Sequence, residues 1–238
     1  MKETANCNIL LVEDDNNLNY LIQENLSSKG YSVISSFDGK DGYKRFREFD
    51  LDLCILDIMM PKMDGFLLAE KIRSVNDTIP IIFLTSRAME SDKLKGFKIG
   101  CDDYITKPFS LMELDYRIQA ILKRSSKIQD TDEAGIYTIG SFEFDHLTRV
   151  LKSPNLSEKK LTRKEGELLK LFCERKNTLI QRSFLMNHIW GNDDYFISRI
   201  LDVYLSRIRN LLKADSSVEI LNVYGTGYQL TDKKNSPS

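Results

Sequence analysis

Residues 52–65 constrain the fold of this chain more than any other stretch. The apolar residues 53–56, Leu-Cys-Ile-Leu, predict a short strand that is buried on both faces, as in a parallel sheet. The strand leads to Asp57, and the sequence PKMDG soon afterwards predicts a turn. Open α/β sheets place their chemistry at the carboxyl ends of strands, so Asp57 is a candidate functional residue. A carboxylate there is a metal ligand, a nucleophile or a helix cap, and the residues that converge on it decide between these roles.

Around this strand, the first half of the chain alternates between short apolar runs and amphipathic segments. The apolar runs predict strands at 8–12, 32–35, 53–56, 81–84 and 104–105. The segments that follow them predict helices at about 16–29, 39–48, 66–75, 92–99 and 110–123. Ser110 and Glu113 form a predicted capping box at the start of the last helix. Five strand–helix units predict an α/β fold, a doubly wound, flavodoxin-like parallel sheet of five strands with helices on both faces.

The alternation stops at residues 125–135, which are polar, lack an apolar face and therefore predict a linker. Beyond it, short runs predict antiparallel strands at 136–139, 142–144 and 150–151. Three helices follow at about 163–174, 182–190 and 197–212, the first with a capping box of Thr162 and Glu165. Strands at 218–223 and 228–230 then flank Gly-Thr-Gly in a hairpin. We expect two domains, at 6–124 and 136–232, the second a smaller α+β domain.

Charge is distributed unevenly between these halves. Residues 1–125 carry 17 Lys and Arg against 20 Asp and Glu, whereas residues 136–238 carry 16 against 12. This modest asymmetry suggests that the second half alone meets a polyanion. No apolar run approaches the ~20 residues that span a bilayer, and the first residues lack a secretory pattern. We therefore expect a cytoplasmic protein without a membrane partner. The four cysteines are widely spaced and the histidines number only two, which argues against a zinc site.

Polar residues follow four of the five predicted strands in the first half. They are Glu13-Asp14-Asp15, Asp57, Thr85-Ser86 and Thr106-Lys107-Pro108. The doubly wound arrangement would bring these strand ends to one edge of the sheet. Crowded carboxylates repel one another, and a hard divalent cation such as Mg²⁺ relieves that repulsion while leaving positions for water and phosphate oxygens. Taken alone, Lys107 is an ordinary surface lysine and Thr85 a strand-end residue, so the prediction depends on their combination and spacing.

Residues 8–124 resemble the receiver domain of bacterial two-component response regulators. The resemblance is carried by Glu13-Asp14-Asp15, the LDIMMPKMDG run around Asp57, Thr85-Ser86 and Lys107-Pro108-Phe109. It implies that Asp57 accepts a phosphoryl group from a sensor histidine kinase. The implied Mg²⁺ ligands are Asp14, Asp15, Asp57 and the main-chain carbonyl of Met59.

The same resemblance implies roles for three further residues. Lys107 would neutralise charge on the phosphoryl oxygens, and Thr85 would donate a hydrogen bond to one of them after transfer. Tyr104 would turn inward as Thr85 moves, so that the two residues form a switch. From the residues alone, Tyr104 is a half-buried aromatic at a strand end.

The predicted helix at 197–212 presents one broad apolar face, and its other sides are polar. Arg199, Val203, Ser206 and Asn210 lie opposite the apolar face, with Arg207 and Arg209 at its flanks. Seen alone, this is an ordinary solvated amphipathic helix. The preceding helix, the closing hairpin and the positive charge together predict a winged helix-turn-helix domain, in which arginines reach bases or phosphates.

Residues 136–232 resemble the DNA-binding domain of the OmpR/PhoB family. The matching segments are LTRKE at 161–165, Leu168-Leu169, IWG at 189–191, Arg199, Asp202-Val203, SRIR at 206–209 and YGTGY at 224–228. The resemblance implies that residues 197–212 enter the major groove of double-stranded promoter DNA and residues 224–228 approach the minor groove. It also implies RNA polymerase as a partner. The implied DNA contacts are Trp190, Arg199, Val203, Ser206, Arg207, Arg209, Tyr224 and Thr226.

Two positions depart from the family pattern. Tyr224 stands where the wing usually carries an arginine, and Ser206 stands at a position that is often basic. The resemblance therefore leaves the operator sequence and the salt dependence of binding open.

The resemblance further implies a homodimer on phosphorylation, formed through the fourth helix, fifth strand and fifth helix of the receiver. The charges at the matching positions are Lys93 opposite Glu113, Asp103 opposite Arg117, and Asp102 opposite Arg124. Exposed pairs contribute about 0–1 kcal/mol each, so their value would lie in register and choice of partner.

Three functions are compatible with these features. The first is a transcription factor switched by phosphorylation, whose chemistry is limited to its own phosphorylation and dephosphorylation. The second is a constitutive DNA-binding regulator with a receiver that serves only as a dimerisation scaffold, against which the full acidic set argues. The third is a phosphatase-like enzyme with a phospho-aspartate intermediate, which would need a substrate cleft that the sequence does not indicate.

Overall fold

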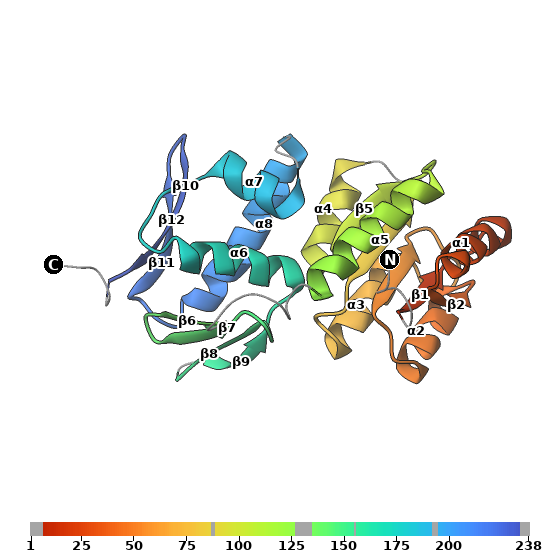
Figure 1. Ribbon diagram of the computed structural model, residues 1–238, viewed down its shortest axis with the longest axis horizontal. Helices are drawn as coiled ribbons and strands as arrows, with labels where there is room; N and C mark the ends of the chain where they lie inside the picture. The colour runs from red at the N-terminus through yellow and green to blue at the C-terminus, as the bar shows by residue number, and fades with distance from the viewer. Residues whose placement is uncertain (1–6, 87–88, 127–134, 155, 192–194, 234–238) are drawn as a thin grey trace. The chain divides into compact units, whose positions relative to one another are not determined.

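A computed structural model describes residues 7–86, 89–126, 135–154, 156–191 and 195–233, apart from the side chains of residues 90, 123–126, 156, 195 and 196. The chain divides into two compact units, an N-terminal unit of residues 1–129 and a C-terminal unit of residues 130–238 (Figure 1). None of the helices in the described ranges combines the length and apolar character needed to cross a membrane.

The N-terminal unit has the predicted alternation of strands and helices. Its strands are β1 (Asn8–Val12), β2 (Ser32–Ser36), β3 (Leu53–Asp57), β4 (Ile81–Thr85) and β5 (Asp103–Thr106). Its helices are α1 (Asn16–Ser28), α2 (Gly39–Glu48), α3 (Gly65–Val75), α4 (Glu90–Ile99) and α5 (Leu111–Ser126). The strands form one parallel sheet in the order β2-β1-β3-β4-β5. This confirms the predicted doubly wound fold, although α5 continues into residues that were expected to begin the linker.

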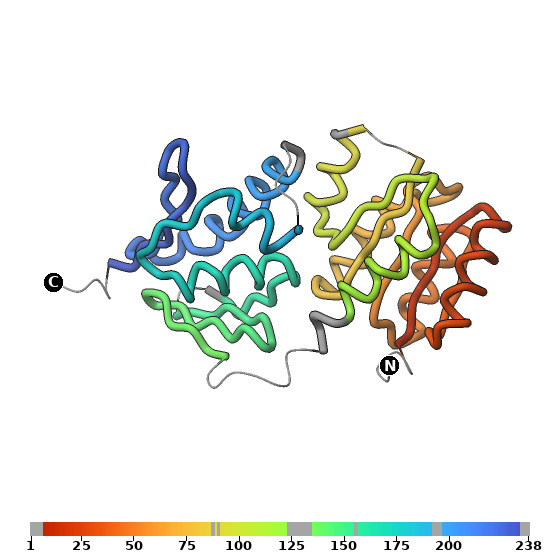
Figure 2. Tube along the Cα trace, turned by 45° about the horizontal axis from the view of Figure 1, so that its top comes forward, coloured from red at the N-terminus to blue at the C-terminus, as the bar shows by residue number. Residues whose placement is uncertain are grey.

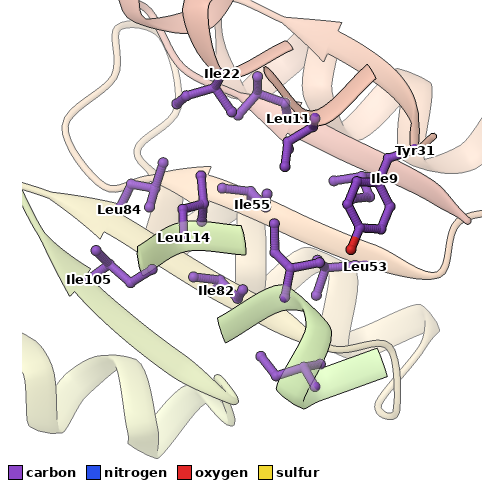
Figure 3. Packing of buried hydrophobic residues seen from close by; sticks show 13 residues of the cluster. Ile9, Leu11, Ile22, Tyr31, Leu53, Ile55, Ile82, Leu84, Ile105 and Leu114 are labelled. Atoms are coloured by element: carbon purple, nitrogen blue, oxygen red, sulfur yellow. The ribbon is translucent and has the colours of Figure 1, made fainter. Parts of the chain in front are cut away.

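Helices cover both faces of this sheet. On one face, alternate residues of β1, β3 and β4 pack against α1 and α5, as Ile55 does in the cluster with Ile22 and Leu114 (Figure 3). On the other face, the ring of Phe66 in α3 meets that of Phe83 edge-on, with centroids 5.3 Å apart. All five residues of β3 are consequently buried, which explains why the strand reads as a continuous apolar run.

The C-terminal unit contains two antiparallel sheets and three helices. The first sheet has the order β6-β7-β8-β9, formed by β6 (Ile136–Ile139), β7 (Phe142–Asp145), β8 (Val150–Ser153) and β9 (Leu156–Lys160). The second has the order β10-β12-β11, formed by β10 (Ile180–Gln181), β11 (Val218–Val223) and β12 (Gly227–Asp232). The helices are α6 (Arg163–Glu174), α7 (Arg182–Trp190) and α8 (Tyr195–Leu212). The hairpin of β11 and β12 extends from its unit (dark blue in Figure 2).

Strands β9 and β10 were not predicted. In β9 the side chains of residues 157–160 are all exposed, so the strand lacks the alternation of buried and polar residues that would reveal it. Strand β10 has only two residues, which is too short for any periodic pattern.

The predicted capping box at the start of α6 is confirmed. Thr162 Oγ1 accepts from the backbone N–H of Glu165, and Glu165 Oε2 accepts from the backbone N–H of Thr162 at 2.9 Å. Two backbone donors of the first turn are thereby satisfied, which fixes the start of α6 at Arg163.

Replacing Thr162 with alanine is expected to lower the free energy of unfolding of the C-terminal unit by about 1 kcal/mol, because it removes a helix cap. Urea unfolding of the full chain, followed by the fluorescence of Trp190, measures this unit because the chain has a single tryptophan. Thr138→Ala is the matched control, since Thr138 is exposed in β6 and caps no helix. Equal destabilisation by the two variants would show that the cap contributes nothing.

Candidate functional site

The carboxyl ends of the parallel strands bring the predicted residues of the N-terminal unit together. Asp57 is the last residue of β3 and Thr85 the last residue of β4, and both are buried. Glu13 follows β1 directly and is fully buried, and Lys107 follows β5. Because β1, β3 and β4 are neighbours in the sheet, these side chains meet at one edge. We refer to Glu13, Asp14, Asp57 and Lys107 as the acidic pocket.

Lys107 joins two carboxylates of the acidic pocket. Its Nζ lies 2.6 Å from Asp57 Oδ2 and 2.7 Å from Glu13 Oε2. Its own backbone N–H donates to the carbonyl oxygen of Thr85 at 2.7 Å, which fixes the lysine to the end of β4. The peptide bond between Lys107 and Pro108 is cis. The lysine is therefore a built part of the pocket rather than a solvated surface residue.

The loop that follows β3 orients the other oxygen of Asp57. The backbone N–H of Met59 donates to Asp57 Oδ1 at 3.0 Å. The loop ends where Asp64 caps α3 by accepting from Leu67 N at 2.8 Å. Gly65 lies so close that a Cβ added there would be 2.1 Å from the carbonyl oxygen of Asp57, so no other residue fits. The turn predicted from PKMDG thus positions the carboxylate that precedes it.

Burial and the hydrogen bonds of Lys107 dominate the electrostatics of the acidic pocket. Burial raises the pKa of Glu13 to about 7, the hydrogen bond with Lys107 opposes this rise, and the charge of Asp57 adds to it. Burial alone would lower the pKa of Lys107, but the hydrogen bonds with Asp57 and Glu13 raise it above its ordinary value. The lysine therefore stays protonated, and the pocket has an excess of negative charge for a cation to neutralise.

Three carboxylates of the acidic pocket could hold a metal ion. Oxygen atoms of Glu13, Asp14 and Asp57 all lie within 4.8 Å of one another. Asp14 is exposed, so the pocket opens to solvent on that side. Hard carboxylate oxygens with room for water suit Mg²⁺, so the donor set fits the predicted ion.

Asp15, a predicted Mg²⁺ ligand, caps a helix in the structure. Asp15 is the N-cap of α1, and its Oδ1 accepts from the backbone N–H groups of Asn17 at 2.9 Å and Leu18 at 3.1 Å. Glu13, which the sequence analysis did not assign to the metal, belongs to the cluster instead. The signal that could have identified Glu13 is its place directly after the buried run of β1, where the chain is still held to β2 by a hydrogen bond from Glu13 N to Ser36 O.

The predicted switch residues lie on adjacent strands. Thr85 is fully buried, and Tyr104 in β5 is 8% exposed, with its ring turned into the unit. The ring meets that of Phe83 edge-on at 6.2 Å. Lys93 Nζ lies 6.0 Å from the centroid of the Tyr104 ring, so this lysine of α4 packs over the proposed switch.

Several charged residues predicted at the dimer interface form ion pairs or hydrogen bonds within the N-terminal unit. Arg117 contacts both oxygens of Asp103, at 3.0 and 2.9 Å, and also Glu113 at 2.8 Å. Asp102 is only 8% exposed, accepts from the backbone N–H of Ile81 at 3.0 Å and lies 3.8 Å from Arg73. As a buried residue that holds β4, Asp102 does not have the exposed position that the sequence analysis gave it. The side chain of Arg124 lies outside the described part of the chain.

Helix α8 has the two faces that the sequence predicted. Ile200, Tyr204 and Ile208 are buried, and Arg199 and Ser206 are exposed. Val203 is half-buried between these two sets. The exposed face could reach a DNA groove while the apolar face holds the helix to its unit.

Three residues that were predicted to contact DNA contact other residues of the C-terminal unit. Arg207 donates to Glu165 Oε1 at 3.2 Å, and Arg209 donates to the carbonyl oxygen of Ile220 at 3.0 Å. The ring of Trp190 lies 5.5 Å from that of Tyr204, and its indole nitrogen is buried. In this conformation the three residues brace α8, the indole nitrogen of Trp190 is buried, and the two arginines stay half-buried.

The wing is the hairpin of β11 and β12, and hydrogen bonds connect its base to α8. The residues that form these bonds had no predicted role. Asp202 on α8 accepts from Arg182 Nη2 at 2.8 Å and from the hydroxyl of Tyr228 in β12 at 3.1 Å. Arg182 also donates to that hydroxyl. At the tip, Tyr224 is 96% exposed and Thr226 is exposed. The wing thus presents polar and aromatic groups to solvent from a base that is fixed to α8.

Comparison with known families matches both units. Residues 9–119 match the response regulator receiver domain. Residues 157–230 match the C-terminal domain of transcriptional regulatory proteins. The two matches follow one another in the order that the sequence predicted.

Relatives and solved structures cover nearly the whole chain. The transcriptional regulatory protein RprY of Bacteroides fragilis is 49% identical over 93% of this chain and 93% of its own length. A structure of the Thermotoga maritima response regulator DrrB, described as an OmpR/PhoB homolog, is 26% identical, covers 94% of this chain and 99% of that chain, and has a TM-score of 0.50. A structure of a RitR mutant shares the fold, with a TM-score of 0.74 at 23% identity over 95% of this chain and 99% of that chain. This chain therefore belongs to the OmpR/PhoB family of two-component response regulators, with a receiver domain followed by a transcriptional regulatory domain.

Proposed function

We propose that Asp57 accepts a phosphoryl group in a Mg²⁺-dependent reaction and that this modification controls DNA binding by the C-terminal unit. The observation that supports the proposal most strongly is the pair of contacts from Lys107 to Glu13 and Asp57 beside a cluster of three carboxylates. The Asp57 carboxylate, the proposed nucleophile, therefore lies beside both the proposed cation site and the ammonium group of Lys107. The working boundaries are 6–124 for the receiver, 125–135 for the linker and 136–232 for the DNA-binding domain.

The chemistry follows from the position of Asp57. One of its oxygens attacks phosphorus in line, the new O–P bond forms, and the bond from phosphorus to the donor's leaving group breaks. Lys107 and the backbone N–H of Met59 hold the Asp57 carboxylate in one orientation. The side chain therefore does not have to give up rotational freedom when it attacks phosphorus. Lys107 then neutralises charge on the transferred oxygens, and Thr85 lies one strand away as a hydroxyl donor.

The proposed Mg²⁺ ligands are Glu13, Asp14 and Asp57, with Glu13 in place of Asp15. When bound, the ion would neutralise charge that spreads over the phosphoryl oxygens. The carbonyl of Met59 stays a predicted ligand, because it lies in the loop next to Asp57. The proposed phosphodonor in the cell is a sensor histidine kinase, and the cytoplasmic location stays a prediction.

The proposed DNA-binding surface consists of the exposed face of α8 and the tip of the wing. Arg199, Ser206, Tyr224 and Thr226 are exposed there, which supports major-groove contact by α8 and minor-groove contact by the wing. The roles of Trp190, Arg207 and Arg209 are proposed to be indirect, through the position of α8. Dimerisation through Lys93, Asp103, Glu113 and Arg117, and contact with RNA polymerase, remain proposals.

The Arg199→Ala variant is expected to bind its operator about tenfold more weakly than the wild type, because the variant lacks an exposed cation on the groove-facing side of α8. Fluorescence anisotropy with a selected duplex measures the affinity at several salt concentrations. Lys213→Ala is the charge-matched control, since Lys213 is exposed just beyond the end of α8. If both variants lose the same affinity, only general charge is involved and α8 is not the reading helix.

The link between phosphorylation and DNA binding is tested by selecting genomic fragments with the full chain, with and without beryllofluoride and Mg²⁺. The proposal predicts strong enrichment of specific fragments only with the phosphoryl analogue. Equal enrichment in both conditions would favour a constitutive regulator. Sustained turnover of phosphoester substrates by the same protein would favour the phospho-aspartate enzyme. A cavity of about 530 Å³ is lined by Asn8 and Asp52, at the other end of the strands from Asp57, and does not provide that enzyme's cleft.

A further inference from the structure

The loop between β3 and α3 is tied to the start of α2 by an ion pair. Lys62 Nζ in this loop lies 2.5 Å from Asp38 Oδ2. Asp38 is the N-cap of α2, and its other oxygen accepts from the backbone N–H groups of Lys40 and Asp41, both at 2.9 Å. The hydrogen bond from Lys62 and those from the backbone lower the pKa of Asp38, so its carboxylate stays charged. One carboxylate thus fixes a helix start and reaches across to the loop.

The same two segments also touch through their backbones. A Cβ added at Gly39, the first residue of α2, would lie 2.4 Å from the carbonyl oxygen of Met63. Lys62 adopts a left-handed backbone conformation with φ of 65°, which is uncommon for a residue other than glycine. The backbone is therefore strained at Lys62, whose side chain reaches Asp38. Such strain is commonly kept at functional positions, which favours a functional role for the contact between Lys62 and Asp38.

The loop acts on the acidic pocket directly. Its Met59 N–H donates to Asp57 Oδ1, while Lys107 holds Asp57 Oδ2. A shift of the loop would remove one of these two donors and let the Asp57 carboxylate rotate. The orientation of the nucleophile consequently depends on where the loop is held.

The corner between β2 and α2 is itself anchored to the strand that leads to Glu13. Asn19 of α1 is fully buried, and its Nδ2 donates to the carbonyl oxygens of Glu13 and Ser36, each at 3.0 Å. Ser36 Oγ donates in turn to the carbonyl oxygen of Asp38 at 3.0 Å. These bonds link the chain at Glu13, through the corner and Lys62, to the loop that touches Asp57.

We propose that Lys62 is a positioning residue: its ion pair with Asp38 holds the loop after β3 in register with Glu13 and Asp57, and thereby strengthens Mg²⁺ binding without contact to the ion. This inference rests on the proposed Mg²⁺ site. The side chain of Lys62 is 60% exposed, so the pair contributes little to the stability of the fold, and its effect falls on the site. Outer residues that orient metal ligands commonly change metal affinity in this way.

The direction of the change in Mg²⁺ affinity distinguishes this proposal from an effect of long-range charge alone. Lys62 carries a positive charge near a proposed cation site, so its removal should strengthen Mg²⁺ binding if only long-range charge acts. If the ion pair holds the loop, the same removal should weaken Mg²⁺ binding. The two explanations therefore predict opposite shifts for Lys62→Gln.

The test is isothermal titration calorimetry of the full chain with Mg²⁺ alone, at fixed ionic strength and without phosphodonor. Lys62→Gln is expected to raise the dissociation constant of Mg²⁺ roughly 3–10-fold, below the usual 10–100-fold for such partners because the pair is exposed. Asp38→Asn keeps a side-chain oxygen for the cap and should give the same increase. The double variant should be no worse than either single variant, and Lys62→Arg should bind as the wild type does. Lys40→Gln removes an exposed charge from the same corner and should leave affinity unchanged or slightly higher.

Unchanged or tighter Mg²⁺ binding by Lys62→Gln would overturn the positioning role, and so would additive losses in the double variant. If the wild type itself takes up no Mg²⁺, the proposed metal site fails and this inference fails with it. Thermal unfolding without Mg²⁺ should be the same for wild type and Lys62→Gln, since a general loss of stability would explain weaker binding without any positioning.

Discussion

Replacing Asp57 with asparagine is expected to reduce phosphorylation of the full chain by a small-molecule phosphodonor at least about a thousandfold, as loss of a nucleophile commonly does. The amide oxygen is uncharged and a poor nucleophile, whereas its shape still allows acceptance from the Met59 N–H. The variant should therefore fold normally, while it loses the phosphoryl acceptor and the charge that Asp57 contributes to the proposed Mg²⁺ site. Incorporation of acid-labile phosphate, followed over time in Mg²⁺, measures the effect.

Asp52→Asn is the matched control for this experiment. Asp52 lies directly before β3, at the opposite end of the strand from Asp57, and accepts from Asn8 N at 2.8 Å. Its replacement should leave phosphorylation unchanged, because the residue is a strand length away from the acidic pocket. If Asp57→Asn still takes up phosphate at the wild-type rate, another residue is the acceptor.

Replacing Lys107 with glutamine is expected to slow phosphorylation about a hundredfold at saturating Mg²⁺, the order observed when one charge-stabilising donor is removed. The ammonium contacts both Glu13 and Asp57, so it is placed to meet charge that develops on the phosphoryl oxygens. The affinity for Mg²⁺ should not fall, because the pocket becomes more negative without the lysine. Rate against Mg²⁺ concentration separates these two effects.

Lys40→Gln again provides the control for loss of one positive charge, since Lys40 is exposed on α2. A maximum rate near that of the wild type for Lys107→Gln would contradict the proposed role. A large loss of Mg²⁺ affinity with an unchanged maximum rate would instead make the lysine an organiser of the metal ligands.

The sequence was sufficient for the sheet of the N-terminal unit and for most of its acidic pocket. Strand β3 is buried on both faces, so its residues must all be apolar until the strand ends, and the first acid marks that end. The same reasoning could not assign roles to Glu13, Asp14 and Asp15, the three consecutive acids after β1. There the sequence does not say which carboxylate stays with the sheet and which one caps the helix. The structure assigns Glu13 to the pocket and Asp15 to the cap of α1.

The residues at the margins of helices were harder to assign. Arg207 and Arg209 lie at the border between the buried and exposed sides of α8, where a long side chain can turn either way. Arg207 donates to Glu165, which is 42 residues away, and Arg209 donates to the carbonyl oxygen of Ile220 in β11. Asp102 lies before β5 and binds the backbone of Ile81, a contact that depends on strand pairing. Such contacts follow from tertiary structure and leave no periodic pattern.

The role of Asp57 is tested most directly by locating the phosphoryl group on the full chain. Phosphorylation in Mg²⁺, reduction of the acyl phosphate with borohydride and peptide mass spectrometry convert a phosphorylated aspartate to homoserine at its position. Homoserine is expected at Asp57 alone, and none is expected when Mg²⁺ is removed with a chelator. Homoserine at another acid, or equal conversion of Asp57 without Mg²⁺, would contradict the proposed role of Asp57.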